Sequence, residues 1–156
     1  MILDEEDLVR WGREVGRGLE TPVFIGLKGP LGAGKSVLAR AIARGAGVDR
    51  RMPSPTFNLL FRYPAAGGRT VVHVDLYRLE DPGELWELGW EELGAEEEVV
   101  LVEWPERAGE LLPADRWEVT LEVPGSGTEV DGPRARLRVV TVERIGDPPD
   151  LPGAPS

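Results

Sequence analysis

Apolar residues along the chain recur with two different spacings, one typical of helices and one of strands. In residues 4–19 they recur at intervals of three and four, at Leu8, Trp11, Val15 and Leu19, with acidic residues ahead of basic ones. This pattern predicts an amphipathic helix. Residues 23–27 are a short apolar run typical of a buried strand, and residues 36–44 read as a second helix that Gly45 ends. Residues 99–102 form the most continuously apolar stretch and predict a central strand buried on both faces.

Two further stretches have the pattern of β-hairpins. Residues 57–63 and 69–75 read as strands on either side of a turn rich in proline and glycine. Residues 117–123 and 135–139 alternate apolar with polar side chains around a second such turn. Each pair of stretches predicts two adjacent antiparallel strands. With the helices and the central strands, they predict an α/β fold: a single-domain mixed sheet with antiparallel hairpins, flanked by helices.

The segment between the two hairpins is rich in glutamate. Asp81 and Pro82 predict a helix start, with a side-chain cap followed by proline, and residues 106–112 suggest another short helix. We interpret the glutamates within residues 84–98 as a solvated face. An acidic surface that meets a basic partner is the alternative.

Length and composition indicate one domain. The 156 residues suffice for a single core, and we expect a domain over residues 1–145 followed by a disordered Pro/Gly-rich tail over residues 146–156. The lack of cysteine excludes a disulfide partner. The sequence has neither a run of about 18 apolar residues nor a basic-then-apolar leader, so we expect no membrane contact and a cytoplasmic location.

The net charge narrows the range of binding partners. A formal charge of −10 at pH 7 repels the phosphate backbone of nucleic acids. Contact with RNA would therefore require a local basic patch or a partner protein, and a bare RNA-binding module is disfavoured.

A glycine-rich motif lies between the first predicted strand and the second predicted helix. Residues 29–36 read Gly-Pro-Leu-Gly-Ala-Gly-Lys-Ser and satisfy the pattern G-x-x-x-x-G-K-[ST]. Its glycines let the backbone form a concave nest of N–H donors, and the helix start adds its dipole. We expect Lys35 to reach the outer phosphates and Ser36 to ligate Mg²⁺. The pattern predicts a P-loop NTPase-like nucleotide site built from Gly29, Leu31, Gly32, Ala33, Gly34, Lys35, Ser36 and Val37.

Two acidic residues at predicted strand ends are candidates for the chemistry beside this loop. Glu103 follows the apolar run at 99–102, and Asp75 ends the run at 71–74. Ligands of open α/β sheets bind at the carboxyl edge of the strands. We therefore expect Glu103 to reach Mg²⁺ or its water, and Asp75 to face the nucleotide. The alternative for each is an acid that only caps a turn.

Thr56 and His73 are further polar candidates. Thr56 lies in a Ser-Pro-Thr loop, where many triphosphatases carry a hydroxyl that senses the outer phosphate. A plain turn is the alternative. His73 is the only histidine of the chain, and we interpret it as a hydrogen-bonded structural residue rather than a base.

The residue types that are missing also narrow the class. The chain has no glutamine to orient an attacking water as Ras-like GTPases do, and leucine follows its one asparagine, so it lacks the guanine-reading Asn-Lys-x-Asp motif. Adenine is therefore favoured over guanine. Water activation would fall to Glu103, Asp75 or a group from a partner, which predicts slow turnover by the isolated chain.

Four sequence blocks together resemble the signature of the TsaE (YjeE) family. They are residues 29–36, Ser-Pro-Thr-Phe at 54–57, His-Val-Asp-Leu-Tyr-Arg-Leu at 73–79 and Val-Glu-Trp-Pro-Glu at 102–106. The resemblance spans residues 3–142. It implies an ATPase that uses ATP and Mg²⁺ and works with TsaD- and TsaB-type proteins to make threonylcarbamoyladenosine in tRNA, with only indirect contact to the tRNA.

The resemblance also assigns roles by position. It implies Lys35 on the phosphates, Ser36 and Glu103 at Mg²⁺, and Asp75 near the reacting phosphate. It further implies that Thr56 lies in a switch-like loop that couples the nucleotide state to partner docking.

The chain departs from the family pattern in the loop. Family loops usually read Asp where Pro30 stands, and two threonines where Ser36 and Val37 stand. Serine keeps the hydroxyl ligand, but Val37 lacks the second hydroxyl. Trp104 could stack on a base or a partner, or could be structural.

Two other function classes remain open at this point. A small-molecule P-loop kinase is the first, although no arginine-rich lid segment lies between the late helices. A binding module that ATP gates without useful turnover is the second.

Overall fold

The computed structural model describes residues 1–52, 59–124 and 137–153. Its helices and strands are β1 (Ile2–Leu3), α1 (Glu5–Gly18), β2 (Val23–Lys28), α2 (Lys35–Gly45), β3 (Leu60–Pro64), β4 (Thr70–Asp75), α3 (Glu84–Glu87), β5 (Glu98–Glu103), β6 (Arg116–Glu122) and β7 (Arg138–Ile145). Short 3-10 helices span Ala66–Gly68, Trp90–Glu92 and Pro105–Leu111. No helix in the described part of the chain is long and apolar enough to cross a membrane.

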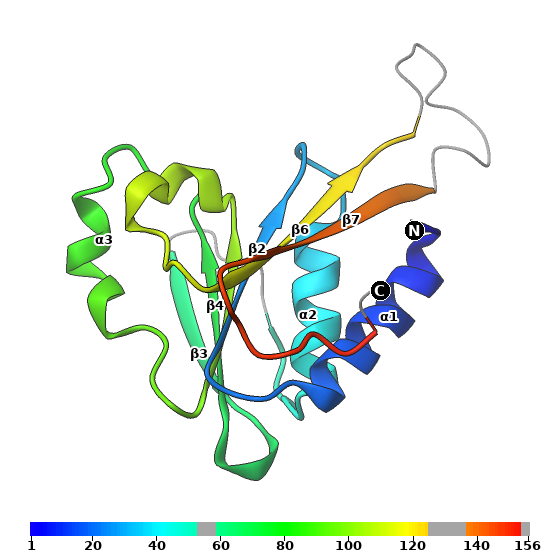
Figure 1. The fold of residues 1–156 in the computed structure, drawn as a ribbon, viewed down its shortest axis with the longest axis horizontal. Helices are drawn as coiled ribbons and strands as arrows, with labels where there is room; N and C mark the ends of the chain where they lie inside the picture. The colour runs from blue at the N-terminus through cyan, green and yellow to red at the C-terminus, as the bar shows by residue number, and fades with distance from the viewer. Residues whose placement is uncertain (53–58, 125–136, 154–156) are drawn as a thin grey trace.

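Within the described residues the strands form one seven-stranded sheet in the order β1-β7-β6-β2-β5-β4-β3 (Figure 1). β2 pairs in parallel with β5 on one side and with β6 on the other, and β5 pairs in parallel with β4. β3 pairs antiparallel with β4, and β7 pairs antiparallel with β6 and β1. The predicted mixed sheet and both predicted hairpins are confirmed. The parallel centre brings the carboxyl ends of β2, β4 and β5 to one edge.

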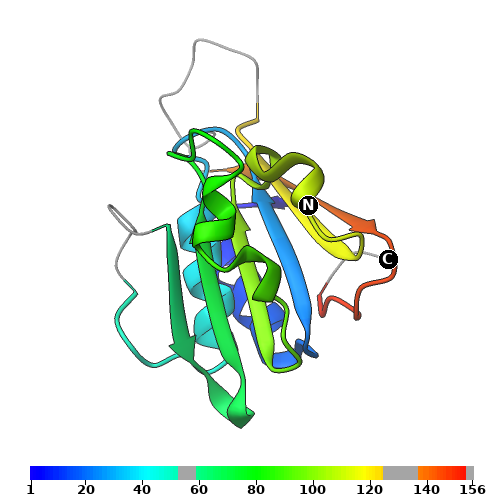
Figure 2. The ribbon, with the colours of Figure 1, turned by 90° about the vertical axis from the view of Figure 1, so that its left-hand side faces the viewer.

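Each face of the sheet has its own apolar core. α1 and α2 pack side by side over one face, where they enclose Leu38, Ile25 and Leu101. The segments that connect β4 to β5 and β5 to β6, including α3, cover the other face (Figure 2). There the rings of Phe24 and Trp90 meet edge to face, with their centres 5.9 Å apart. The central strand β5 is buried along its whole length, as the sequence predicts.

The first helix begins and ends as its sequence predicts. Asp4 caps α1, because its side chain accepts a hydrogen bond from the Asp7 backbone N–H at 2.8 Å. Acidic residues occupy the first turn and Arg17 the last, which suits the helix dipole. Gly16 allows a close crossing of α2, since a Cβ there would lie 2.0 Å from the Ile42 carbonyl oxygen.

The helix expected from Pro82 is much shorter than the sequence suggests. α3 is a single turn of four residues, and its N-cap is Gly83. The Asp81 side chain accepts a hydrogen bond from the Gly83 N–H at 2.9 Å. It therefore closes a local turn rather than capping a longer helix. Gly89, at a φ of 75°, ends the segment and starts the next turn.

Glu98 is not part of the solvated glutamate face that the sequence suggests. It is 6% exposed at the start of β5. Its carboxylate accepts hydrogen bonds from the N–H groups of Gly94 and Ala95 at 2.9 and 3.2 Å, and from Arg62 at 3.3 Å. These three donors make the burial of its charge possible.

The expected disordered tail is wrong for residues 146–153, which pack against α1 and β6. Leu151 is buried. The indole N–H of Trp11 donates to the Gly153 carbonyl at 2.9 Å, and that of Trp117 donates to the Pro149 carbonyl at 2.7 Å. Prolines exclude a helix here but leave an extended segment whose carbonyls satisfy two buried indoles. Residues 154–156 lie outside the described residues.

Candidate nucleotide-binding site

The glycine-rich loop lies between β2 and α2, as the sequence predicts. Gly34 has a φ of 108° and immediately precedes the first residue of α2. Gly29 has a φ of 143°, and a Cβ on it would lie 2.4 Å from the Leu121 carbonyl oxygen. Glycine is therefore required at both positions. The loop delivers its backbone to the start of a helix, where N–H groups are free to bind an anion.

Lys35 is held against the loop that precedes it. Only 4% of it is exposed, and its Nζ donates to the carbonyls of Gly29 and Pro30 at 2.6 and 2.9 Å. The same ammonium lies 4.1 Å from the centre of the Trp104 ring. An ammonium has three N–H donors, so one remains for an anion in the loop.

The structure brings Ser36 and Glu103 together across the loop. Glu103 ends β5, and the Ser36 hydroxyl donates to its two carboxylate oxygens at 2.9 and 3.1 Å. Glu103 is 3% exposed, and within the described residues His73 is the only basic side chain in ion-pair contact with it. Alcohol and carboxylate oxygens suit Mg²⁺, and no Lys or Arg in residues 1–52, 59–124 and 137–153 forms an ion pair with this buried carboxylate. The donor set therefore fits a divalent cation.

His73 touches this carboxylate, which the sequence interpretation missed. Its Nε2 lies 2.6 Å from Glu103 Oε2, and its Nδ1 has no hydrogen-bond partner among the described residues. It is hydrogen-bonded, as expected, but its partner is a residue of the site. The available signal was its position two residues before Asp75, which places both side chains on one face of β4.

Asp75 lies beside Glu103 at the same sheet edge. The two residues are paired in the parallel register of β4 and β5. Asp75 Oδ1 accepts a hydrogen bond from the Tyr77 N–H at 3.0 Å. Burial raises the pKa of the Asp75 carboxyl; the Tyr77 N–H opposes this shift, and the negative charge of Glu103 adds to it.

The charge on Lys35 is also disfavoured by its surroundings. Burial lowers the pKa of its ammonium, while Glu103, Glu106 and Asp75 act in the opposite direction. The fold compensates these buried charges only in part. A polyanion would offset the positive charge of Lys35, and a cation would offset the negative charges of Asp75 and Glu103.

Lys35, Ser36, Asp75 and Glu103 all line one hollow of about 280 Å³ beside the loop. It is lined by Leu31, Gly32, Gly34, Lys35, Ser36, Val37, Asp75, Tyr77, Glu103 and Trp104. Of the predicted site residues, Gly29 and Ala33 belong to the loop but do not line this hollow. Thr56 lies outside the described residues.

Trp104 and Tyr77 form an aromatic wall of this hollow. Their ring centres lie 5.2 Å apart, and the Arg107 guanidinium lies 5.7 Å from the Tyr77 ring. Trp104 adopts a φ of 59°, a conformation that non-glycine residues rarely adopt. Since its ring contacts Lys35, Trp104 belongs to the site as well as to the packing of the edge.

A larger hollow of about 890 Å³ lies on the other side of the loop. It is lined by Asp4, Glu5, Glu6, Leu8, Val9, Gly32, Ala33, Gly34, Val37 and Arg138. Arg138, from β7, donates to the carbonyls of Ala33 and Gly32 at 2.9 and 3.4 Å. Sequence reasoning missed Arg138, because only the sheet order brings β7 next to the loop.

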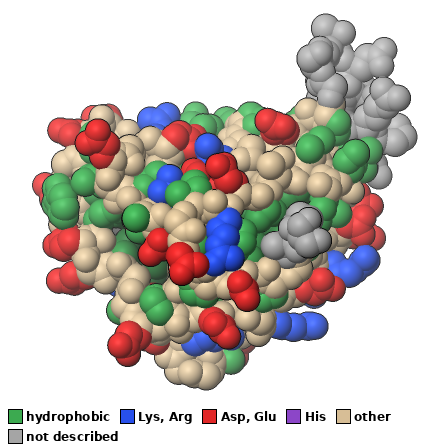
Figure 3. Space-filling view, viewed as in Figure 1, with side chains coloured by type: hydrophobic (Ala, Val, Ile, Leu, Met, Phe, Trp, Pro, Cys, Tyr) green, Lys and Arg blue, Asp and Glu red, His purple; other side chains and the backbone are tan. Residues whose placement is uncertain are grey.

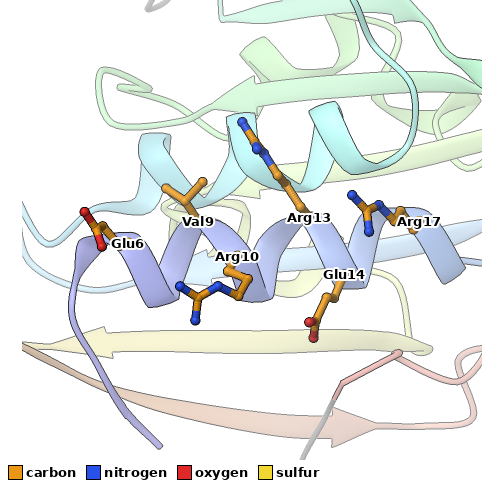
Figure 4. Close-up of a pocket in the computed structure, with 6 residues that line it drawn as sticks. All are labelled: Glu6, Val9, Arg10, Arg13, Glu14 and Arg17. Carbon is orange, nitrogen blue, oxygen red and sulfur yellow. The ribbon is translucent and has the colours of Figure 1, made fainter.

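A third hollow, of about 270 Å³, runs along the outer face of α1 (Figure 4). Its lining comes from this helix alone: Glu6, Val9, Arg10, Arg13, Glu14 and Arg17. The side chains of Arg10 and Glu14 point to one side of the helix and that of Arg13 to the other. It gathers no loop or strand-end residue, so it is not the candidate site.

A sheet with a parallel centre, in which β2 leads through a glycine loop into a helix that starts with Lys and Ser, defines a class of proteins. With an acidic residue at the end of the adjacent strand, this is the arrangement of the P-loop NTPases. The chain has this fold.

Comparison with known proteins narrows the class to one family. The family model described as "Threonylcarbamoyl adenosine biosynthesis protein TsaE" matches residues 2–129. The chain belongs to the TsaE family, whose members take part in the biosynthesis of threonylcarbamoyladenosine in tRNA. The resemblance seen in the four sequence blocks is confirmed.

Individual relatives agree with this assignment. The chain is 36% identical over 122 residues to the tRNA threonylcarbamoyladenosine biosynthesis protein TsaE of Treponema pallidum, covering 78% of this chain and 89% of that one. It is 40% identical over 124 residues to the protein of the same name from Mycobacterium bovis, covering 75% and 74%. The crystal structure of Bacillus subtilis YdiB shares the fold, with a TM-score of 0.71 at 23% identity, covering 94% of this chain and 84% of that one.

Proposed function

We propose that this chain binds and hydrolyses ATP, with Mg²⁺, to support threonylcarbamoyladenosine modification of tRNA in the cytoplasm. The observation that carries the nucleotide chemistry is the contact between Ser36 and Glu103, at 2.9 Å, in the hollow that also holds Lys35. An alcohol, a buried carboxylate and an ammonium around one glycine loop fit a triphosphate with its metal.

Each group has a distinct part in this proposal. The loop N–H groups and Lys35 hold the phosphates, and Ser36 and Glu103 hold Mg²⁺. When bound, the metal would supply positive charge to the phosphate oxygens. We assign the orientation of the attacking water to Asp75, and its register with Glu103 supports this assignment. The raised pKa of its carboxyl makes it a better proton acceptor than an exposed aspartate.

The two hollows beside the loop suggest which way the nucleotide runs. The smaller one contains Lys35, Asp75 and Glu103, so the outer phosphates belong there. The larger one shares Gly32, Gly34 and Val37 with it and continues to α1 and Arg138. We assign the nucleoside to this larger hollow. Adenine is favoured because the chain lacks a guanine-reading motif.

The partners in this proposal are TsaD- and TsaB-type proteins, with tRNA contacted only indirectly. The net charge of −10 disfavours direct tRNA binding. On the face shown in Figure 3, acidic and basic side chains are interspersed and the basic groups are small. We propose that the loop containing Thr56 switches with the nucleotide and changes affinity for the partners.

The test is phosphate release from ATP, measured with and without a TsaD–TsaB pair and a metabolite pool. We expect slow release of free phosphate that requires Mg²⁺ and increases with the partners. A phosphorylated metabolite would support a small-molecule kinase instead. Nucleotide binding with no phosphate released in a single turnover would support a binding module without catalysis.

Capture of the partners tests the switch separately. Immobilised chain loaded with ATP is compared with chain loaded with ADP, in the presence of purified TsaD and TsaB. We expect the pair to be retained in only one of these nucleotide states. Equal retention in both states would contradict a nucleotide-dependent switch, while phosphate release could still support an ATPase.

A further inference from the structure

His73, Glu103 and Ser36 form a continuous chain of hydrogen-bonding groups from the core to the loop. His73 is 1% exposed and Glu103 is 3% exposed. His73 Nε2 lies 2.6 Å from Glu103 Oε2, while the Ser36 hydroxyl donates to Oε1 at 2.9 Å. The Ser36 hydroxyl also reaches Oε2, at 3.1 Å, so Oε2 is contacted from both strand β4 and helix α2, whereas Oε1 is contacted from α2.

The imidazole makes this contact while its second nitrogen, Nδ1, bonds to none of the residues that the structure describes. An ionised carboxylate only accepts hydrogen bonds, so Nε2 carries the proton. Nδ1 is buried, and no group in the described part of the chain bonds to it, which costs free energy. Val71, on the same face of β4, and Leu101, the partner of His73 in β5, are both fully buried, so an apolar side chain would suit this position. The contact to Glu103 is what histidine adds there.

The strand register makes this contact specific. His73 is paired with Leu101 in the parallel ladder, and Asp75 is paired with Glu103. His73 on β4 therefore contacts Glu103 on the adjacent strand β5 diagonally, two residues beyond its direct partner Leu101. A carboxylate held in this way at one oxygen cannot rotate away from Ser36.

We propose that His73 is a positioning residue that orients Glu103 toward Ser36 and thereby sets the affinity of the site for Mg²⁺. This inference rests on the proposed function, because it requires a metal-nucleotide site at the loop. Groups that hold a metal ligand in place commonly affect metal affinity by about 10- to 100-fold.

The first test varies the Mg²⁺ concentration in nucleotide-binding measurements on three variants. In His73→Asn the amide is too short to reach Glu103, whereas in His73→Gln it extends about as far as Nε2. We expect the Mg²⁺ concentration for half-maximal binding to rise about 10- to 100-fold in His73→Asn and to stay near the wild-type value in His73→Gln. Nucleotide affinity in EDTA should be the same in both.

Val72→Ala is the matched control. It disturbs the same strand from the opposite face, so it should lower thermal stability and leave the Mg²⁺ requirement unchanged. A wild-type Mg²⁺ requirement in His73→Asn would overturn the positioning role. An equal rise in Val72→Ala would also overturn it, because strand stability would then explain the effect.

A second measurement uses the wild-type protein without nucleotide. Since His73 is the only histidine, ¹⁵N NMR of labelled protein reports on this one ring. We expect the proton on Nε2 and a bare Nδ1 in the wild type; a proton on Nδ1 alone would overturn the inference. If the wild type showed this tautomer but no Mg²⁺-dependent nucleotide binding, the proposed function would fail while the contact stood.

Discussion

The two ends of strand β5 each bury a carboxylate, and the two are stabilised differently. Glu98, at the start, accepts hydrogen bonds from two backbone N–H groups and is paired with Arg62 at 3.3 Å. Glu103, at the end, contacts Ser36 and His73, and no Lys or Arg of the described residues pairs with it. Burial alone therefore does not distinguish a functional carboxylate from a structural one. The groups that compensate its charge do.

This difference has an energetic reason. A buried carboxylate is costly unless a counter-charge and donors offset its lost hydration. The fold supplies both to Glu98, so that residue stabilises the turn before β5. At Glu103 the described residues supply the Ser36 hydroxyl and the His73 ring but no Lys or Arg ion pair, which leaves room for a bound cation as counter-charge. Lys35, which shares the hollow, is itself shielded by loop carbonyls.

The largest effect is expected from removing Lys35. Lys35→Ala should reduce ATP turnover at least about 100-fold, since a buried cation that stabilises transferring charge is lost. Phosphate release and calorimetric titration with Mg-ATP measure it. Lys28→Ala is the matched control: it removes the only other lysine, which pairs with Glu118 at 3.8 Å outside the hollow. Equal losses in both variants would contradict a specific role for Lys35.

The next largest effect is expected from removing the charge of Glu103, with the same change at Glu98 as the comparison. Glu103→Gln keeps the shape of the side chain but removes the charge, so it should lower the affinity for Mg²⁺ at least about 10-fold and slow hydrolysis more than it weakens nucleotide binding. Glu98→Gln should leave both quantities at their wild-type values. Parallel Mg²⁺ titrations of nucleotide binding and phosphate release provide the comparison. If Glu98→Gln lost as much activity as Glu103→Gln, the distinction between the two ends would be wrong.

Stability should respond in the opposite order. Glu98→Gln breaks a matched ion pair and should lower the free energy of unfolding by about 1 kcal/mol. Glu103→Gln removes a buried charge that forms no ion pair with a described Lys or Arg, so stability should change little or increase. Urea denaturation of the two variants without nucleotide measures both values. A larger loss in Glu103→Gln would show that Glu103 is mainly structural.

The smallest effect concerns Asp75 and depends on pH. Burial raises its folded-state pKa above the ordinary value of 3.8, so the ionised form lowers stability at neutral pH, and this penalty vanishes below that value. Asp75→Asn keeps an acceptor for the Tyr77 N–H and should raise the melting temperature at neutral pH. The gain should shrink as the pH falls through the raised pKa. Thermal melts across this range check it; a gain that does not change with pH would contradict the cause.

Much of the fold could be predicted from local patterns. The continuous apolar run at 99–102 and the motif at 29–36 specify a central strand and the loop beside it, and both are confirmed. The helix expected after Pro82 is present but is a single turn without the predicted side-chain cap, and Gly89, at a φ of 75°, follows its end. The tail failed because proline content does not reveal that two indoles need carbonyl acceptors.

The site was less accessible to sequence reasoning than the fold. Ser36, Lys35, Asp75 and Glu103 could be predicted because a motif and strand ends define them, and the structure places all four around one hollow. Arg138 and the contact of His73 with Glu103 could not. Both depend on strand order and register, which are set by packing between segments distant in the sequence.

Calorimetric titration of Mg-ATP into the wild-type protein, repeated in EDTA, tests the central claim most directly. Because no described Lys or Arg forms an ion pair with Glu103, we expect a saturable heat of binding that fits one site per chain. We expect the affinity to fall strongly when EDTA removes Mg²⁺. Absence of heat from folded protein, or the same binding curve in EDTA, would contradict a metal-nucleotide site at this loop.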